Sequence, residues 1–123
     1  MVHKSKASKC DYDFENDTIL FYGGSDKYKF SMDLDGIILD VNEDNYIMGI
    51  EILDASKKFK FSKSDLRDIS KFSATIKTNK KNIEVNMKLK INKRNKLINR
   101  CLDALTLNTM NLPSRTQGLA VTC

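Results

Sequence analysis

Residues 36–56 read GIILDVNEDNYIMGIEILDAS, and this stretch decides how the chain is expected to fold. Two apolar runs, residues 37–41 and 46–53, are separated by the polar residues NEDN. Within each run apolar side chains recur at every second position, which is the period of a β-strand. Asn and Asp favour tight turns because their side chains bond nearby backbone groups. The stretch therefore predicts a β-hairpin.

The polar residues of this stretch also match the spacing of an EF-hand calcium loop, with Asn in place of the usual Gly. The matching residues are Asp40, Asn42, Asp44, Asn45 and Glu51. An EF-hand loop lies between two helices, whereas both flanks here have the pattern of strands. Glu51 would also lie several residues along the second strand, at about 3.3 Å per residue. We therefore expect a polar turn here and no metal site.

The period of two continues on both sides of this hairpin. The further predicted strands are residues 18–22, 28–34, 72–76 and 83–91. Asp35-Gly36 has the composition of a tight hairpin turn, and residues 79–82 read as a second turn. Residues 83–91 alternate without a break and give the clearest strand pattern in the chain.

Two segments have helical features. Residues 62–70 predict a short helix with Ser62 or Ser64 as its N-cap and with Leu66 and Ile69 turned inward. Near the C-terminus an apolar stripe has helical spacing, and Pro113 blocks its continuation. The stripe consists of Leu97, Ile98, Cys101, Leu102 and Leu105. The expected fold class is α+β, mainly antiparallel β-hairpins with a short central helix and a C-terminal amphipathic helix that covers the sheet.

The length of 123 residues suits a single domain. We expect a flexible N-terminal tail over residues 1–10, a β-rich domain over 11–112, and a C-terminal tail over 113–123 that is either an edge strand or disordered. A division of the domain near Phe61 is too weak to separate two domains. No apolar run approaches the roughly 18 residues needed to span a membrane. With no secretion signal at the N-terminus, a cytoplasmic location is expected.

The net charge of +5 is unevenly distributed. Residues 1–60 contain eight lysines and twelve acidic residues, whereas residues 61–123 contain thirteen basic and four acidic residues. Such asymmetry is consistent with an anionic partner for the second half, or with attraction between the two halves within or between chains. The excess of Lys, Asn and Ile is also typical of proteins encoded by AT-rich genomes. These three explanations remain open.

Residues 11–22, DYDFENDTILFY, and residues 33–56 resemble the small prokaryotic DUF2283 family. That family has a YD-x-E-x-D-x-L-Y pattern followed by an IxLDxDxDGxxxGIEILDAS-like block, with Gly where this chain has Asn45. The matching positions are Tyr12, Asp13, Glu15, Asp17, Leu20, Asp40, Gly49, Ile50, Glu51, Ile52, Leu53, Asp54, Ala55 and Ser56. The resemblance implies a small β-rich domain without an established activity. Family members beside toxin-like genes hint at a protein partner.

The sequence offers few groups for catalysis. Asp11, Asp13, Glu15 and Asp17 recur with period two, which suits a solvated edge strand better than an acid–base pair. The chain has one histidine, His3, and no glycine-rich phosphate loop, so we expect no enzyme and no cofactor.

The three cysteines are not spaced as a zinc site or as a disulfide framework. We therefore expect reduced thiols in a cytosol. Cys101 lies on the predicted helical stripe, where it would be a small core residue.

Basic residues of the second half are candidates for contact with an anion or a nucleic acid. They are Lys77, Lys80, Lys81, Lys88, Lys90, Lys93, Arg94, Lys96 and Arg100. This hairpin carries no exposed aromatic residue for base stacking, and a solvated lysine face is the simpler interpretation. We expect a non-enzymatic interaction module that forms a homo-oligomer, with a dimer favoured, or pairs with a small protein partner. Nucleic-acid binding is the alternative, and no membrane contact is expected.

Overall fold

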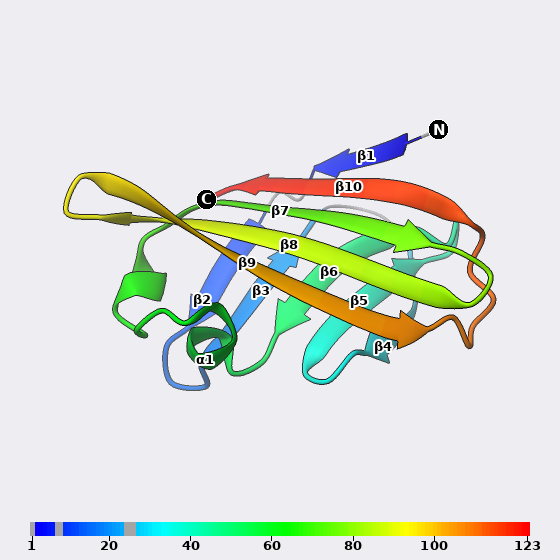
Figure 1. Ribbon diagram of the computed structural model, residues 1–123, viewed down its shortest axis with the longest axis horizontal. Coiled ribbons are helices and arrows are strands. Elements are labelled where there is room, and N and C mark those ends of the chain that lie inside the picture. Colours follow the sequence, from blue (N-terminus) through cyan, green and yellow to red (C-terminus); the bar gives the residue numbers. More distant parts are fainter. Residues whose placement is uncertain (1, 7–8, 24–26) are drawn as a thin grey trace.

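The computed structural model describes residues 2–6, 9–23 and 27–123 as two five-stranded β-sheets and two short helices. The large sheet has the strand order β1 (Val2–Lys6), β10 (Arg115–Thr122), β7 (Ile69–Thr78), β8 (Asn82–Lys93) and β9 (Lys96–Leu107). The small sheet has the order β2 (Lys9–Asp13), β3 (Thr18–Tyr22), β6 (Ile47–Ile52), β5 (Ile37–Asn42) and β4 (Tyr28–Asp33). The helices are α1 (Ala55–Phe59) and the 3₁₀ turn η1 (Asp65–Arg67). Figure 1 shows the large sheet in front of the small one.

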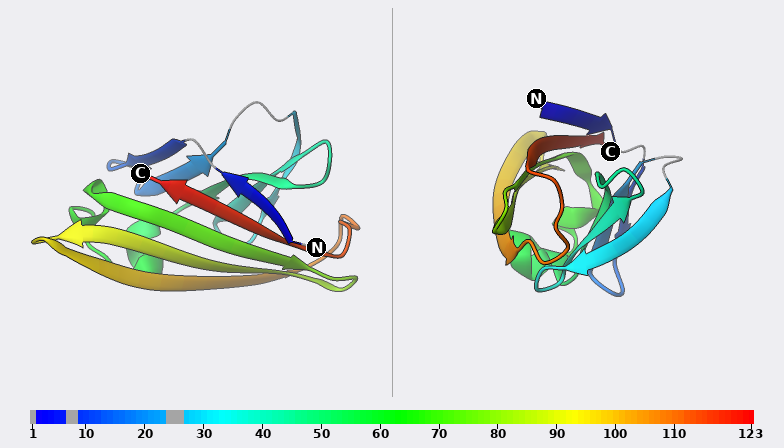
Figure 2. Two further views of the ribbon diagram at one scale, coloured as in Figure 1. Left: turned by 90° about the horizontal axis from the view of Figure 1, so that it is seen from above. Right: turned by 90° about the vertical axis from the view of Figure 1, so that its right-hand side faces the viewer.

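The core lies between the two sheets, which face each other in Figure 2. Alternate side chains of β7 and β8 point inward and are buried, and those of β3, β5 and β6 meet them from the other side. The rings of Phe21 and Phe72 stack across the interface with their centroids 3.8 Å apart. One buried polar side chain, Gln117 of β10, bonds both the N–H and the C=O of Ile47, at 2.8 and 2.7 Å. Apolar packing and the Gln117 amide therefore both hold the sheets together.

The predicted hairpin over residues 36–56 is confirmed. Strands β5 and β6 pair antiparallel, with a bulge between Asp40 and Val41. In their connecting turn, Oδ1 of Asn42 accepts hydrogen bonds from the N–H groups of Asp44 and Tyr46. Asn45 adopts a left-handed conformation with φ 64°, which Asn tolerates. The amide side chain that matched a calcium ligand thus holds the turn.

Two further predicted turns are confirmed. Asp35 and Gly36 both have positive φ, and Leu34 and Ile37 exchange backbone hydrogen bonds across them. Strands β7 and β8 also form the expected antiparallel hairpin. At its turn the side chain of Asn79 accepts hydrogen bonds from the N–H groups of Lys81 and Asn82.

The predicted C-terminal helix is wrong, and so is the α+β fold class that depended on it. Residues 96–107 form β9, which pairs with β8 over twelve residues without a register shift. Arg94 and Asn95 both have positive φ, so the chain reverses in a two-residue turn that sequence inspection missed. Apolar residues on both faces of β9 imitate helical spacing. The fold is predominantly β.

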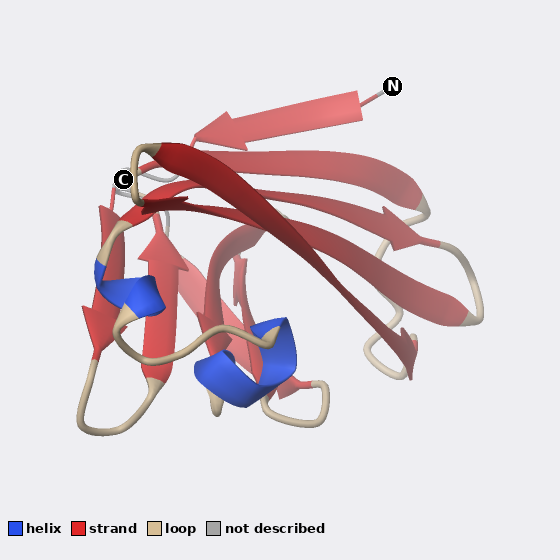
Figure 3. Cartoon of the chain, turned by 60° about the vertical axis from the view of Figure 1, so that its left-hand side comes forward, coloured by secondary structure: helices blue, strands red, loops and turns tan. Residues whose placement is uncertain are grey.

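The predicted central helix is reduced to the three residues of η1, whose Leu66 is buried. Ser62 and Asp65 bond each other's backbone N–H groups at its start. The α-helix α1 lies earlier in the chain, directly after β6, and buries Ala55 and Phe59. Figure 3 shows both helices on one side of the sheets, in the loops that lead from the small sheet to the large one.

Both terminal segments contribute strands to the large sheet. Strand β1 pairs parallel to β10, and β10 pairs antiparallel to β7. Residues 1 and 7–8 of the expected N-terminal tail lie outside the described residues. The tail expected after Pro113 contains β10, which is an interior strand and not an edge strand.

Cys10 and Cys123 are joined by a disulfide, with their Cα atoms 5.6 Å apart. The prediction of reduced thiols is therefore wrong for these two residues. Cys10 belongs to β2 of the small sheet, and Cys123 follows β10 of the large sheet. The bond is a covalent link between the two sheets. No helix in the described part of the chain is long and apolar enough to cross a membrane.

Candidate interaction surface

Strand β9 forms one edge of the large sheet, and in the described part of the chain no strand pairs with its outer side. It is twelve residues long and contains no proline. Three leucines on its solvent face are more than half exposed: Leu97 at 58%, Leu105 at 66% and Leu107 at 67%. Long, apolar and unprotected edges are natural sites for pairing with another strand.

The turn at the start of β9 determines which backbone groups face outward. In a two-residue hairpin the flanking residues, here Lys93 and Lys96, bond each other, and bonded positions then alternate along the ladder. Even-numbered residues of β9 consequently bond to β8, and the odd-numbered ones direct their N–H and C=O groups to the free side. The carbonyl of Asn99, an odd-numbered residue, accepts a hydrogen bond from the guanidinium of Arg100. This bond is consistent with a carbonyl that faces away from β8. The free side of β9 thus offers a regular row of donors and acceptors.

The other described edges are shorter or protected. Strand β4 has six residues and an irregularity between Tyr28 and Phe30. Strand β2 has five residues and carries the acidic side chains Asp11 and Asp13, which discourage pairing. Strand β1 has five residues. Of these edges, β9 is the one best suited to accept another strand.

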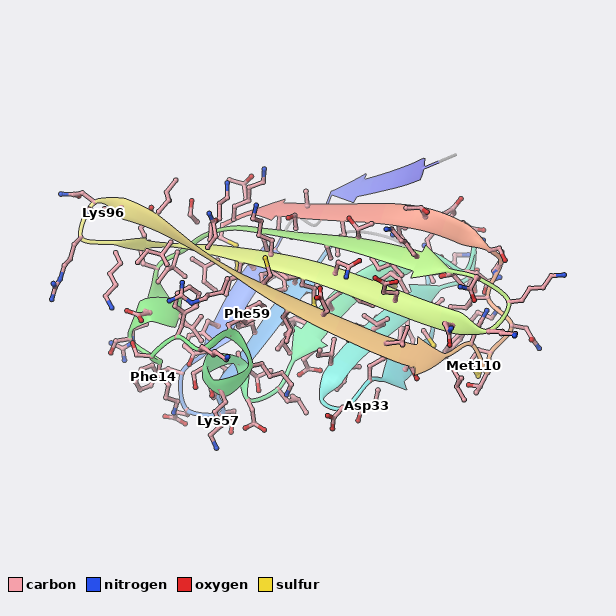
Figure 4. All side chains as sticks on the ribbon, viewed as in Figure 1. Phe14, Asp33, Lys57, Phe59, Lys96 and Met110 are labelled. Atoms are coloured by element: carbon pink, nitrogen blue, oxygen red, sulfur yellow. A yellow bond between two sulfur atoms is a disulfide. The ribbon has the colours of Figure 1, made fainter. Side chains whose placement is uncertain are left out.

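The basic residues singled out from the sequence do not converge on one site. Lys80 and Lys81 lie in the β7–β8 turn at one end of the large sheet, and Lys93, Arg94 and Lys96 lie at the opposite end, where Figure 4 labels Lys96. Lys93 forms an ion pair with Asp65 at 3.3 Å. Arg100 lies over the ring of Phe61, with its guanidinium carbon 4.9 Å from the ring centre.

Two of these residues, Lys88 and Lys90, share the outer face of the large sheet with Lys77. With Lys71 and Ser73 they line a shallow hollow of about 160 Å³. Lys71 was not singled out from the sequence, because its neighbourhood to Lys88 and Lys90 depends on the pairing of β7 with β8. Three of the four residues that line this hollow are lysines.

The acidic residues at the start of the chain have separate roles. Asp17 is buried and accepts hydrogen bonds from the Tyr12 hydroxyl at 2.8 Å, the Ser56 hydroxyl at 2.6 Å and the Ser56 N–H at 3.0 Å. Burial raises the pKa of the Asp17 carboxyl, but the hydrogen bonds from Ser56 and Tyr12 outweigh it and leave the pKa lowered. Burial and the bond to Asp17 raise the pKa of Tyr12. The Asp17 carboxylate therefore connects the β2–β3 turn to the start of α1 through hydrogen bonds.

Asp11 and Asp13 lie in β2 and line a shallow hollow of about 370 Å³ with Glu51 and three other residues. Hydrogen bonds from Asn16 lower the pKa of Asp13, so this carboxyl is not a proton donor near neutral pH. Asp40 accepts a hydrogen bond from the Ser31 hydroxyl at 2.6 Å. Within the described residues, no group of three His, Cys, Asp or Glu side chains is placed to hold a metal ion.

A larger cleft of about 560 Å³ lies beside the second half of β9. Its walls come from residues 102–106 of β9, from the β4–β5 turn near Asp33 and Asp35, and from Lys58 of α1. The Lys58 ammonium donates to the backbone carbonyl of Leu53, so it is engaged within the chain. The cleft follows the edge of the large sheet, and α1 contacts β9 beside it.

Comparison with known proteins connects these observations to a family. Residues 9–56 match the family described as "Protein of unknown function (DUF2283)". A Methanosarcina mazei protein named "Putative hypoxanthine phosphoribosyltransferase" is 55% identical over 123 residues, which is the full length of both chains. "Uncharacterized protein MJ0789" of Methanocaldococcus jannaschii is 43% identical over 105 residues, covering 85% of this chain and 90% of its own. No solved structure matches. The resemblance noted in the sequence is confirmed, and the chain belongs to the DUF2283 family.

Proposed function

We propose that this protein is a non-enzymatic interaction module that associates through the free edge of β9. The observation that carries the proposal is an uninterrupted twelve-residue edge with three exposed leucines. An added strand would satisfy the outward backbone groups and cover apolar side chains, which are the two sources of affinity in strand addition. A cytoplasmic location is part of this proposal. It would place the Cys10–Cys123 pair in a reducing environment, so both redox forms are to be assayed.

The name of the Methanosarcina mazei relative suggests a different function, phosphoribosyl transfer to hypoxanthine. Such a reaction requires phosphate binding, for which proteins commonly use a helix N-terminus or a concave run of backbone N–H groups. In the described chain α1 has only five residues, and the N–H of Ser56 in its first turn donates to Asp17. We therefore favour a binding role, and incubation with hypoxanthine and a phosphoribosyl donor should yield no nucleotide product.

Nucleic-acid binding is the second candidate, favoured by the hollow between Lys71, Lys88 and Lys90. If these lysines grip phosphates, Lys88→Glu combined with Lys90→Glu should abolish retention on heparin and on a single-stranded oligonucleotide. Lys57→Glu combined with Lys60→Glu, on α1 and at its C-cap and away from this face, is the matched control of equal charge change. Retention that falls equally in both variants would reflect net charge alone and would count against a nucleic-acid site.

The leading proposal is tested by comparing two substitutions at Asp103. The Asp103 N–H points to the free side, so Asp103→Pro leaves the β8 ladder intact while it removes a donor and obstructs an added strand. Asp103→Ala loses the same side chain, including its 2.9 Å bond from Asn86, but keeps the N–H. Sedimentation should show association for the wild type and Asp103→Ala, and a folded monomer for Asp103→Pro.

A wild type that sediments as a monomer at every concentration would refute the proposal. Circular dichroism of Asp103→Pro confirms that its sheets are intact. If this variant does not fold, Leu105→Asp supplies the same comparison, because Leu105 is exposed and makes no core contact that a carboxylate would disrupt.

A further inference from the structure

We infer that the partner of β9 is a second copy of the same strand, paired antiparallel about a two-fold axis that passes beside Cys101. This inference rests on the proposed function and specifies its partner and register. Cys101 is an exposed free thiol on β9. In the proposed dimer the two Cys101 residues lie directly opposite each other, and the two large sheets join into one continuous sheet.

Symmetry restricts the registers that are available. A two-fold axis perpendicular to the sheet places one residue of β9 opposite the same residue of the second copy. The numbers of any two opposite residues then add up to twice the number of that central residue. With the axis at Cys101, Leu97 faces Leu105 of the second copy, and Asn99 faces Asp103 of the second copy. Both contacts occur twice. In this register Leu97 and Leu105 therefore meet as apolar pairs, and each Asn99 amide faces an Asp103 carboxylate.

The neighbouring registers are less complementary. Centring the axis on Leu102 places Cys101 opposite Asp103 and Asn99 opposite Leu105. Centring it on Asp103 places two carboxylates directly opposite each other, which is destabilising. Within the chain Asp103 already accepts a cross-strand hydrogen bond from an amide, that of Asn86 at 2.9 Å. The Asn99 amide of the second copy would supply the same contact from the other side.

The backbone geometry is compatible with this register. Odd-numbered residues of β9 direct their N–H and C=O groups to the free side, so Cys101 forms a hydrogen-bonded pair with its counterpart. The Asn99 carbonyl, which accepts the Arg100 guanidinium in the single chain, would accept the N–H of Asp103 from the second copy. In Figure 1 β9 crosses in front of β8, and α1 and strands of the small sheet lie behind and below it; β9 is the last strand of the large sheet.

Disulfide trapping reads the register directly. Opposite residues in a hydrogen-bonded antiparallel pair have Cα atoms about 5.5 Å apart, within the roughly 4.4–6.8 Å range of disulfides. Mild oxidation with diamide should convert the wild type into a covalent dimer through Cys101, while two thiols lose two electrons and two protons to the azo reagent. Cys101→Ser should remain non-covalent. The Cys10–Cys123 bond stays within each chain and does not interfere.

Two further variants distinguish specific pairing from random collision. In the Cys101→Ser background, Asn99→Cys and Asp103→Cys each place a thiol on the same exposed face. Neither should form a covalent dimer alone, because like positions lie about 13 Å apart along the strands. A mixture of the two variants should cross-link efficiently.

The outcomes separate the inference from the function on which it rests. Cross-linking of Cys101 and of the mixed pair, but of neither single variant, supports the register. A wild type that sediments as a dimer but does not cross-link at Cys101 overturns the register and leaves association through an interface intact. A wild type that is monomeric at every concentration refutes both the register and the proposed association through β9.

Discussion

Reducing the Cys10–Cys123 disulfide should destabilise the protein substantially. The bond joins β2 of the small sheet to the residue that follows β10 of the large sheet, with 113 residues of sequence separation. In the chain-entropy model, closing a loop of this length removes unfolded-state entropy equivalent to about 5 kcal/mol at 25 °C. Measured disulfide contributions are typically about 2–4 kcal/mol. We therefore expect Cys123→Ser to lower the free energy of unfolding by about 3 kcal/mol.

Urea unfolding at one fixed protein concentration measures this effect, because the proposed self-association would make stability depend on concentration. Reductant should shift the midpoint of the wild type to that of Cys123→Ser and should not shift the variant further. In a domain of this size the melting temperature should fall by about 4 °C for each kcal/mol lost. Thiol titration of the denatured wild type should find only Cys101 reactive before reduction and all three cysteines afterwards.

Cys101→Ser is the matched control, since Cys101 is exposed and forms no bond within the chain. In dilute solution its stability should lie within about 0.5 kcal/mol of the wild type. Identical urea midpoints for oxidised wild type, reduced wild type and Cys123→Ser would show that the bond does not constrain the unfolded chain and would contradict the expected loss of stability.

Other substitutions test the Asp17 hydrogen bonds, the glycine positions and the β9 edge. Asp17→Ala should cost about 3 kcal/mol in urea unfolding, because it removes three hydrogen bonds to a buried carboxylate; the exposed Asp13→Ala should cost less than about 1 kcal/mol. Because the folded pKa of Asp17 is lowered from 3.8, its contribution is present above about pH 4 and is lost as the pH falls through the folded value, so Asp17→Ala should flatten the acid limb of the stability–pH curve. Gly49→Ala should destabilise by about 1–3 kcal/mol, since its Cβ would meet Tyr22, Asp40 and the Phe21 carbonyl at 3.0–3.2 Å. Gly118→Ala, with nothing within 4 Å, should be neutral by thermal melting. Leu105→Asp should give a folded monomer by sedimentation, and a variant that remains a dimer would exclude β9 as the interface.

The first half of the chain was predictable because period and turn chemistry agree there. Strands β5 and β6 alternate between buried and less buried side chains over most of their length, and the turn between them contains Asn42, whose side chain holds it. Asp35-Gly36 likewise supplies positive φ where the hairpin requires it. In such segments local preference and tertiary packing favour the same conformation.

Strand β9 was not predictable by the same reasoning, because its two faces have different environments. Ile98 and Leu102 point toward the core, whereas Leu97 and Leu105 point to solvent. A strand with apolar residues on both faces has no clean period of two, and its spacing imitates a helix. The signal that could have identified it is the turn at Arg94-Asn95, since Asn tolerates the left-handed region that a two-residue hairpin needs.

The disulfide and the lysine hollow depend on long-range contacts that local pattern does not encode. Cys10 and Cys123 meet because β10 inserts between β1 and β7 and so carries the chain end to β2. Lys71 meets Lys88 and Lys90 through the register of the β7–β8 hairpin. Sheet order and register set both arrangements.

The family motif and the proposed interface lie in different parts of the molecule and should respond differently to mutation. Motif residues form internal joints: Asp17 holds the start of α1, Ala55 is fully buried, and Gly49 allows close approach of β3 to β6. These contacts within the chain explain why the motif predicts the fold. They also occupy the side chains of Asp17 and Ala55, so these two residues are not available to bind a partner. Strand β9 lies beyond residues 9–56 and directs its unused groups outward. Substitutions at Asp17 or Gly49 should therefore lower stability without changing the dissociation constant of the folded dimer, whereas outward substitutions on β9 should change that constant and leave monomer stability nearly unchanged.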